Sequence, residues 1–143
     1  MSQENEVVRA LLWDGVDAIP VIRDDTAWIS YKAQVEPFVE AGCAFVWIFG
    51  AGQRIEVVGL DESRQVWLDW FEPWESVHNE FERLIPVGDQ VISVGRQHGR
   101  LAGTQNEVEM LGASVFLMRD GRVARVEHYA NRAEAFEAVG LRE

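Results

Sequence analysis

The sequence of 143 residues contains one cysteine, Cys43, and few basic residues. A single thiol cannot form a disulfide within the chain, so no oxidising compartment is needed and a cytoplasmic location is expected. Only 13 Lys and Arg stand against 24 Asp and Glu, which gives a formal net charge of -11. Because contacts to a phosphate backbone require clustered basic side chains, neither nucleic acid nor an anionic membrane surface is expected as a partner.

Long apolar runs are also missing. The sequence has no stretch of about 18 apolar residues, as a membrane span would need, and residues 1–6 lack the basic and apolar regions of a signal peptide. It has no glycine-rich phosphate loop, no Gly-x-Ser-x-Gly elbow and no Cys-x-x-Cys pair, so nucleotide, acyl-serine and thiol redox chemistry have no support. The histidines at 78, 98 and 128 have no recognised metal-binding spacing. Neither a metal nor a cofactor is therefore expected.

What is present is the composition of a folded globular protein. Hydrophobic residues make up 48% of the chain and charged residues 26%, which is typical of a domain with its own core. The length is that of one domain, and no internal repeat, low-complexity stretch or linker interrupts it. Residues 1–143 are therefore expected to form a single domain.

The hydrophobic periodicity changes along the chain. The first 40 residues have helical spacing, and the residues after 77 alternate as strands do. The predicted helices cover 3–13, 19–22, 25–39, 61–74 and 132–139, and the predicted strands cover 43–49, 54–58, 77–87, 90–101, 107–119 and 122–130. Asp25 or Thr26 is expected to cap the third helix, and Pro37 to kink or shorten it. Helices followed by strands, with the hairpin signal Asp120-Gly121, indicate an α+β domain whose helices cover one concave face of the sheet.

Four segments resemble sequences found in one family. They are 69–76 (DWFEPWES), 87–91 (VGDQV), 119–123 (RDGRV) and 129–135 (YANRAEA). Together with the order of elements, they make the chain similar to the SnoaL-like branch of the nuclear-transport-factor-2-like superfamily. The resemblance implies a cone-shaped, strongly curved mixed or antiparallel sheet with helices packed on its concave face, a cystatin-like α+β roll. It also implies a homodimer and a pocket for a small, mostly apolar, oxygen-bearing molecule.

The superfamily contains polyketide cyclases, ketosteroid isomerases and limonene-type epoxide hydrolases, so the resemblance does not define a reaction. Where the epoxide hydrolases have an Arg-x-Asp pair and a second Asp, this sequence has Arg96, His98 and His128. The two-residue period of a strand places Arg96 and His98 on one face with Ile92 and Val94, which suits a pocket that begins apolar and becomes basic. We expect the three side chains to converge, with Arg96 orienting an oxygen and a histidine carrying protons.

The isomerase mechanism lacks a counterpart in this sequence. By resemblance its general base falls near Trp47 and Ile48, neither of which can take up a proton, and its oxyanion acid falls near Ser114. A cyclase-type aldol reaction needs an acid–base group in the pocket, which His98 or His128 could supply. Glu127 is adjacent to His128 but is expected to point to the opposite face of its strand.

Aromatic and small polar residues are candidates for contact with a substrate. The expected substrate-binding residues are Trp47, Trp67, Trp70, Ser114 and Phe116. On the predicted helix 61–74 the tryptophans share one face, so packing on the sheet is the simpler interpretation and ligand stacking is the alternative. For Arg96 and Arg100 the simpler interpretation is pairing with glutamates of the neighbouring strand.

Two functions follow from these patterns. The first is a cofactor-independent SnoaL-like enzyme of cyclase, hydrolase or isomerase type. The second is a non-catalytic module that uses the same pocket to capture a small molecule, or uses its sheet for dimerisation. The geometry of Arg96, His98 and His128 is the observation that bears most on the choice.

Overall fold

A six-stranded sheet with helices on both of its faces makes up the protein, seen here in a computed structural model that describes residues 3–142. The helices are α1 (Gln3–Leu11), α2 (Ala18–Arg23), α3 (Asp25–Val35), α4 (Leu60–Trp70) and α5 (Arg132–Ala138). The strands are β1 (Val39–Ile48), β2 (Arg54–Val58), β3 (Trp74–Val87), β4 (Gln90–Leu101), β5 (Glu107–Arg119) and β6 (Arg122–Tyr129). None of the described helices is long and apolar enough to cross a bilayer. Each helix and strand predicted from the periodicity is present, and the α+β class is confirmed.

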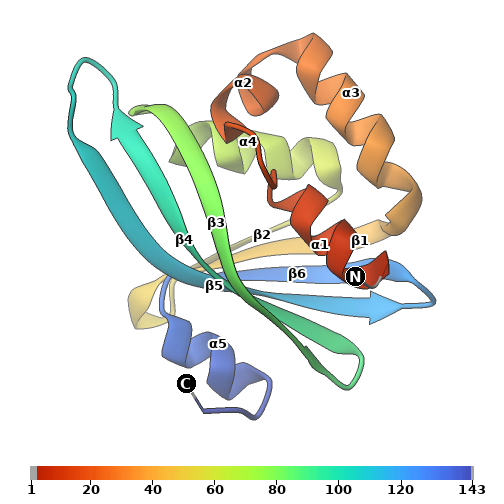
Figure 1. The fold of residues 1–143 in the computed structure, drawn as a ribbon. Helices are drawn as coiled ribbons and strands as arrows, with labels where there is room; N and C mark the ends of the chain where they lie inside the picture. The colour runs from red at the N-terminus through yellow and green to blue at the C-terminus, as the bar shows by residue number, and fades with distance from the viewer. Residues whose placement is uncertain (1–2, 143) are drawn as a thin grey trace.

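The strands follow the order β2-β1-β6-β5-β4-β3 across the sheet. β1 runs parallel to β6, and every other neighbouring pair is antiparallel. The sheet is therefore mixed, as expected, and Figure 1 shows it curving around the helices. Residues opposite each other on adjacent strands face the same side of the sheet, so a row of side chains can be followed across β4, β5, β6 and β1.

Two glycines and a bulge bend the sheet in its middle. Gly95 of β4 lies opposite Phe81 of β3 and Gly112 of β5, and the pairing of β3 with β4 shifts directly after Phe81. A Cβ on Gly95 would collide with the carbonyl oxygen of Glu80, and a Cβ on Gly112 would lie 3.2 Å from the carbonyl oxygen of Tyr129. Glycine therefore permits a close approach of backbones at this bend, and the bulge increases the local twist.

Helices α1 to α4 cover the concave face of the sheet (Figure 1). The larger hydrophobic core lies between these two layers, and its fully buried members include Val8, Ile22, Phe71, Val77 and Phe116. The carboxylate of Asp17 joins the layers, because it accepts a hydrogen bond from the N–H of Ile19 at the start of α2 and another from the N–H of Val77 in β3, both at 3.0 Å. This N-cap therefore fixes the helical layer to the sheet as well as starting the helix.

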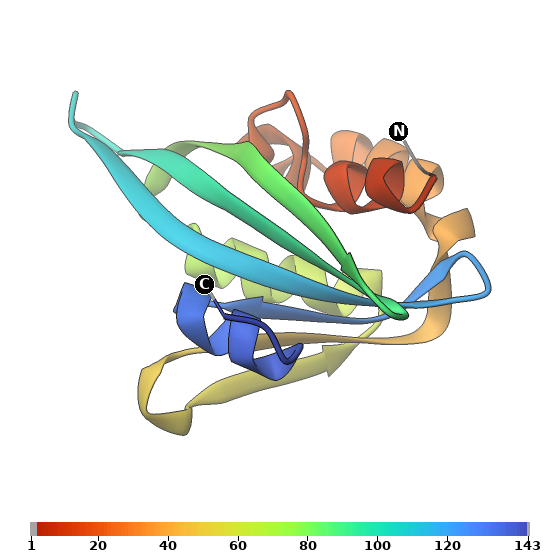
Figure 2. The ribbon, with the colours of Figure 1, turned by 60° about the horizontal axis from the view of Figure 1, so that its bottom comes forward.

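The fifth helix departs from the prediction that all helices cover the concave face. α5 packs on the convex face (Figure 2). There Ala135 and Phe136 form a second, smaller core with Ile92, Val94 and Val115. Both faces of the central strands are therefore apolar near α5, so alternation alone does not show which face lines a pocket.

The boundaries around Pro37 also differ from the predicted ones. α3 ends at Val35, and a 3-10 turn that contains Pro37 leads directly into β1, which begins at Val39. Proline lacks the N–H that would continue the helix, so the segment turns into a strand earlier than the apolar run at 43–49 indicates. The N-cap of α3 is Asp24 instead of either predicted residue, and its carboxylate accepts a hydrogen bond from the N–H of Ala27 at 2.8 Å.

Candidate functional site

A cavity of about 400 Å³ lies between the concave face of the sheet and the helices. Its walls are mostly apolar, with contributions from Leu12, Trp13, Trp47, Trp67, Met110 and Ala113. Trp70 also lines it and is 42% exposed, so it marks where the cavity opens to solvent. The volume suits a small molecule.

A row of polar groups crosses the sheet inside this cavity. Ser93 of β4 is paired with Ser114 of β5, Ser114 with His128 of β6, and His128 with Trp47 of β1. All four residues line the cavity. The hydroxyl of Ser114 lies 2.8 Å from Nδ1 of His128 and shares a hydrogen bond with it. The Ser114–His128 pair is therefore the polar centre of the cavity wall.

Aromatic rings enclose the imidazole of His128. Its ring centre lies 5.5 Å from that of Trp47 and 5.0 Å from that of Trp67, which meets it edge-on. Burial among these rings disfavours the charged imidazolium and lowers the pKa of His128 from 6.5 to about 3. His128 keeps some accessible surface, and this surface faces the cavity. The imidazole is therefore neutral at physiological pH.

A neutral imidazole bonded to a hydroxyl can serve a ligand in two ways. If the hydroxyl of Ser114 donates a hydrogen bond to Nδ1, the hydrogen of the neutral ring is on Nε2, which can then donate a hydrogen bond to a ligand oxygen. If Nδ1 carries the hydrogen and donates to Ser114, Nε2 can only accept a hydrogen bond from the ligand. Nε2 has no partner among the described residues and is not enclosed by protein. Because a pKa of about 3 makes His128 a weak base near pH 7, this geometry favours holding an oxygen over removing a proton from carbon.

Two indole N–H groups in the cavity wall lack acceptors. Nε1 of Trp13 and Nε1 of Trp47 are buried and make no hydrogen bond within the described chain. Both rings pack edge-on against Trp67 at 5.3 Å. Trp13 also has a φ of 57°, a left-handed conformation that is rare for a bulky residue. Unpaired buried donors and backbone strain both concentrate at functional sites.

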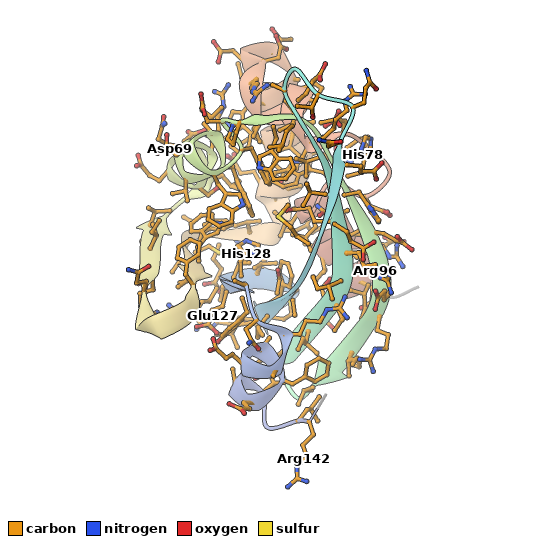
Figure 3. All side chains as sticks on the ribbon, turned by 90° about the vertical axis from the view of Figure 1, so that its left-hand side faces the viewer. Asp69, His78, Arg96, Glu127, His128 and Arg142 are labelled. Carbon is orange, nitrogen blue, oxygen red and sulfur yellow. The ribbon has the colours of Figure 1, made fainter. Side chains whose placement is uncertain are left out.

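Arg96 and His98 do not meet His128 in the cavity. They share one face of β4 with Ile92 and Val94, as the alternation predicts, but this is the convex face, where α5 covers the apolar pair. Figure 3 shows Arg96 and His128 on opposite sides of the strands. The expectation that the three side chains converge is therefore wrong. Ile92 and Val94 are apolar because they pack in the small core under α5, and not because they line the pocket.

Acidic neighbours bind both basic side chains on the convex face. Arg96 touches the edge of the cavity, but its guanidinium pairs with Glu82 at 2.6 Å and with Glu109 at 3.4 Å. His98 is likewise flanked by glutamates at 2.9 Å and 3.4 Å. Contacts between basic and acidic side chains at a protein surface are ordinary structure. Of the three predicted catalytic residues, only His128 directs its side chain into the cavity.

The predicted substrate-binding residues fall into two groups. Trp47, Trp67, Trp70 and Ser114 line the cavity. Phe116 follows on the same side of β5 but is fully buried in the larger core and is not a lining residue. Phe116 therefore supports the wall that carries Ser114.

Sequence reasoning missed other lining residues with polar groups, among them Trp13, Asn79, Ser93 and Gln97. Ser93 and Gln97 lie on the concave face of β4, on either side of Gly95. Gly95 could have indicated this part of the site, because a glycine inside a strand indicates a bend or a close approach of another backbone. Trp13 had no such signal, since its position depends on a left-handed turn after α1.

Uncharged groups supply the polarity of this cavity: serine hydroxyls, a neutral imidazole, indole N–H groups and the amides of Asn79 and Gln97. The charged residues at its edge, Glu80 and Arg96, are paired with partners on the convex face. Within residues 3–142 no group of His, Cys, Asp or Glu side chains could hold a metal ion. Because an unpaired charge is costly in such surroundings, the site suits an uncharged ligand.

A comparison with protein families identifies the class of this chain. The SnoaL-like domain matches residues 38–126, which is more than half of the sequence. The chain therefore belongs to the SnoaL-like family, as the resemblance predicted. No curated protein matches it.

Solved structures share the fold at low sequence identity. A protein from Jannaschia sp. CCS1, assigned as a SnoaL-like polyketide cyclase, is 21% identical with a TM-score of 0.62, over 88% of this chain and 83% of that one. An NTF2-like protein from Burkholderia thailandensis E264 is 22% identical with a TM-score of 0.59, over 90% of each chain. TerC, co-crystallised with polyporic acid, is 15% identical with a TM-score of 0.63, over 96% and 98%. These likenesses show the fold alone.

Proposed function

We propose that the cavity binds a small, mostly apolar, uncharged molecule and that Ser114 and His128 hold an oxygen of that molecule. The observation that carries this proposal is the 2.8 Å contact between Ser114 and His128 inside an aromatic cavity. The aromatic walls supply affinity through burial of apolar surface, and the few polar groups fix the orientation of the ligand. The co-crystallisation of TerC with polyporic acid supports the use of this fold to hold an organic molecule.

Acid–base chemistry at the same place is the second candidate function. A neutral imidazole can donate a hydrogen bond to a carbonyl oxygen and stabilise negative charge that develops there. The likeness to a protein assigned as a polyketide cyclase supports this candidate. The low pKa of His128 and the uncharged polar groups around it in the cavity favour capture of a ligand over catalysis.

Binding is tested with 2-tetralone, an uncharged bicyclic ketone, by isothermal titration calorimetry. We expect saturable binding to the wild type and at least about tenfold weaker binding to His128→Asn, because one hydrogen bond to the ketone is lost. The matched control is His78→Asn, since His78 is exposed on β3, and this variant should bind as the wild type does. Absence of saturable binding, or equal affinity of the wild type and His128→Asn, would contradict the proposal.

Catalysis is tested separately with the same ketone in deuterated water. Nuclear magnetic resonance measures the exchange of the hydrogens next to the carbonyl. Exchange that is faster with the wild type than with His128→Asn would support the acid–base function. Exchange at the uncatalysed rate in the presence of saturated protein would leave ligand capture as the function.

We also infer that the chain forms a homodimer through the convex face of the sheet. Leu111 lies opposite Arg96 on this face and is half exposed, beyond the part that α5 covers. An exposed apolar side chain among charged pairs fits a partly polar interface. Sedimentation velocity at micromolar concentration should show a dimer, and a monomer alone would contradict the inference.

A further inference from the structure

Asn79 and Gln97 form a second polar place in the cavity, separate from the Ser114–His128 pair. They lie opposite each other on β3 and β4, and both line the cavity. From Ser93 to Gln97 the strand extends about 13 Å, at roughly 3.3 Å per residue. The two polar places therefore lie at different positions along the wall of one cavity.

A backbone carbonyl fixes the orientation of both amides. The oxygen of Leu12 can only accept a hydrogen bond, and Nδ2 of Asn79 donates to it at 2.7 Å. Asn79 therefore turns Oδ1 toward Gln97, and Nε2 of Gln97 donates to this oxygen at 3.0 Å. The opposite orientation of Gln97 would bring two oxygens together without a hydrogen between them. The Leu12 carbonyl thus fixes the orientation of the Asn79 amide, and Asn79 in turn fixes the orientation of the Gln97 amide.

This relay leaves one acceptor without a partner. Oε1 of Gln97 makes no hydrogen bond within residues 3–142, and it is not one of the enclosed unpaired atoms of that region. Gln97 is half-buried and lines the cavity. A hydroxyl or N–H of a ligand satisfies such an acceptor, whereas a carbonyl or ether oxygen does not.

The two polar places differ in what they accept. At the Ser114–His128 pair, the hydroxyl and the imidazole can exchange donor and acceptor roles, so either kind of ligand oxygen fits. At Gln97 the chain of hydrogen bonds from Leu12 removes this freedom. Selectivity for the kind of polar group therefore belongs to Gln97.

We propose that Gln97, positioned by Asn79, is a specificity-determining residue that selects ligands with a hydroxyl or N–H donor at the end opposite to the oxygen held by His128. The inference rests on the proposed function, because it assumes a ligand in the cavity. It narrows the ligand class to uncharged, mostly apolar molecules with an oxygen at one end and a donor at the other, such as hydroxylated aromatic ketones.

Three ketones test this inference: 2-tetralone, 6-hydroxy-2-tetralone and 6-methoxy-2-tetralone. The last two differ only in a hydrogen that can be donated. We expect the wild type to bind the hydroxyl compound about tenfold more tightly than the methyl ether, as one additional hydrogen bond would give. In Gln97→Met this ratio should fall to about one, through weaker binding of the hydroxyl compound. Gln65→Met is the matched control, since Gln65 is exposed on α4, and it should keep the tenfold ratio.

A further variant tests the positioning role of Asn79. Asn79→Leu frees the Gln97 amide to turn over, so the ratio between the hydroxyl and methoxy compounds should fall to about threefold, mainly through weaker binding of the hydroxyl compound. A structural role alone would weaken all three ligands together. An unchanged ratio in this variant would exclude the positioning role.

The failures of the two proposals can be told apart. Equal affinity of the wild type for the hydroxyl and methoxy compounds would overturn the selectivity of Gln97 and leave the cavity as a ligand site. A tenfold ratio that persists in Gln97→Met would overturn it as well. If none of the three ketones binds, both proposals fail. The comparison of ligands on the wild type holds even where a variant does not fold.

Discussion

The two faces of β4 use polar residues in different ways. On the convex face, the exposed Arg96 and the half-buried His98 are matched by glutamates of neighbouring strands. On the concave face, Ser93 and Gln97 are uncharged and line an aromatic cavity. Exposed ion pairs contribute little because water already solvates them, whereas an uncharged polar group without a partner in an apolar cavity is available to a ligand. The concave face, which carries no charged residues at these positions, is therefore the face that suits ligand binding.

Phe116→Ala should produce the largest effect, because it removes the support of the concave wall. Phe116 is fully buried on the same side of β5 as Ser114, and loss of a buried phenylalanine costs about 3–5 kcal/mol of unfolding free energy. Urea unfolding followed by circular dichroism measures the change. Val108→Ala on the same strand, where Val108 is exposed, is the control. A loss below about 1 kcal/mol would show that the core does not support this wall.

The concave face should also make stability depend on pH. The pKa of His128 falls from 6.5 to about 3 on folding, so between these values the unfolded chain binds a proton that the folded chain does not. This contribution to stability is complete above about pH 6.5 and is lost as the pH falls toward 3, with a loss of about 2 kcal/mol at pH 5. Unfolding free energies at pH 7 and pH 5 measure it. In His128→Asn that part of the pH dependence should disappear, and an identical loss in the variant would assign it to other groups.

The smallest effects are expected on the convex face. Arg96→Gln and His98→Gln remove contacts to glutamates on the convex face, and of the two only Arg96 touches the edge of the cavity, so the affinity for 2-tetralone should stay within about twofold and the urea midpoint should change little. Calorimetry and urea unfolding measure the two quantities. A tenfold loss of affinity in either variant would show that this residue contributes to ligand binding, and would contradict the assignment of binding to the concave face alone.

Local patterns explain why the strands were predictable and the site was only partly so. Alternation correctly places Ile92, Val94, Arg96 and His98 on one face of β4. Which face lines the cavity depends on α5, whose packing on the convex side is a tertiary contact that no local pattern reports.

Other parts of the site depend on contacts between distant segments. The orientation of Gln97 follows from a hydrogen bond between Leu12 and Asn79, which are far apart in the sequence. Trp13 reaches the cavity through a left-handed backbone that propensity does not predict for tryptophan. His128 and Ser114 were identified through the family resemblance, and register pairing then places them side by side.

Ser114 and the neutral His128 form the uncharged polar centre of the cavity. Nuclear magnetic resonance of the imidazole nitrogens of His128, assigned with the His128→Asn variant, measures the charge of this centre. We expect the chemical shifts of a neutral ring throughout the range from pH 7.5 to pH 5, because burial among Trp47 and Trp67 holds the pKa of His128 near 3. A titration of His128 with a midpoint near 6.5 would contradict it.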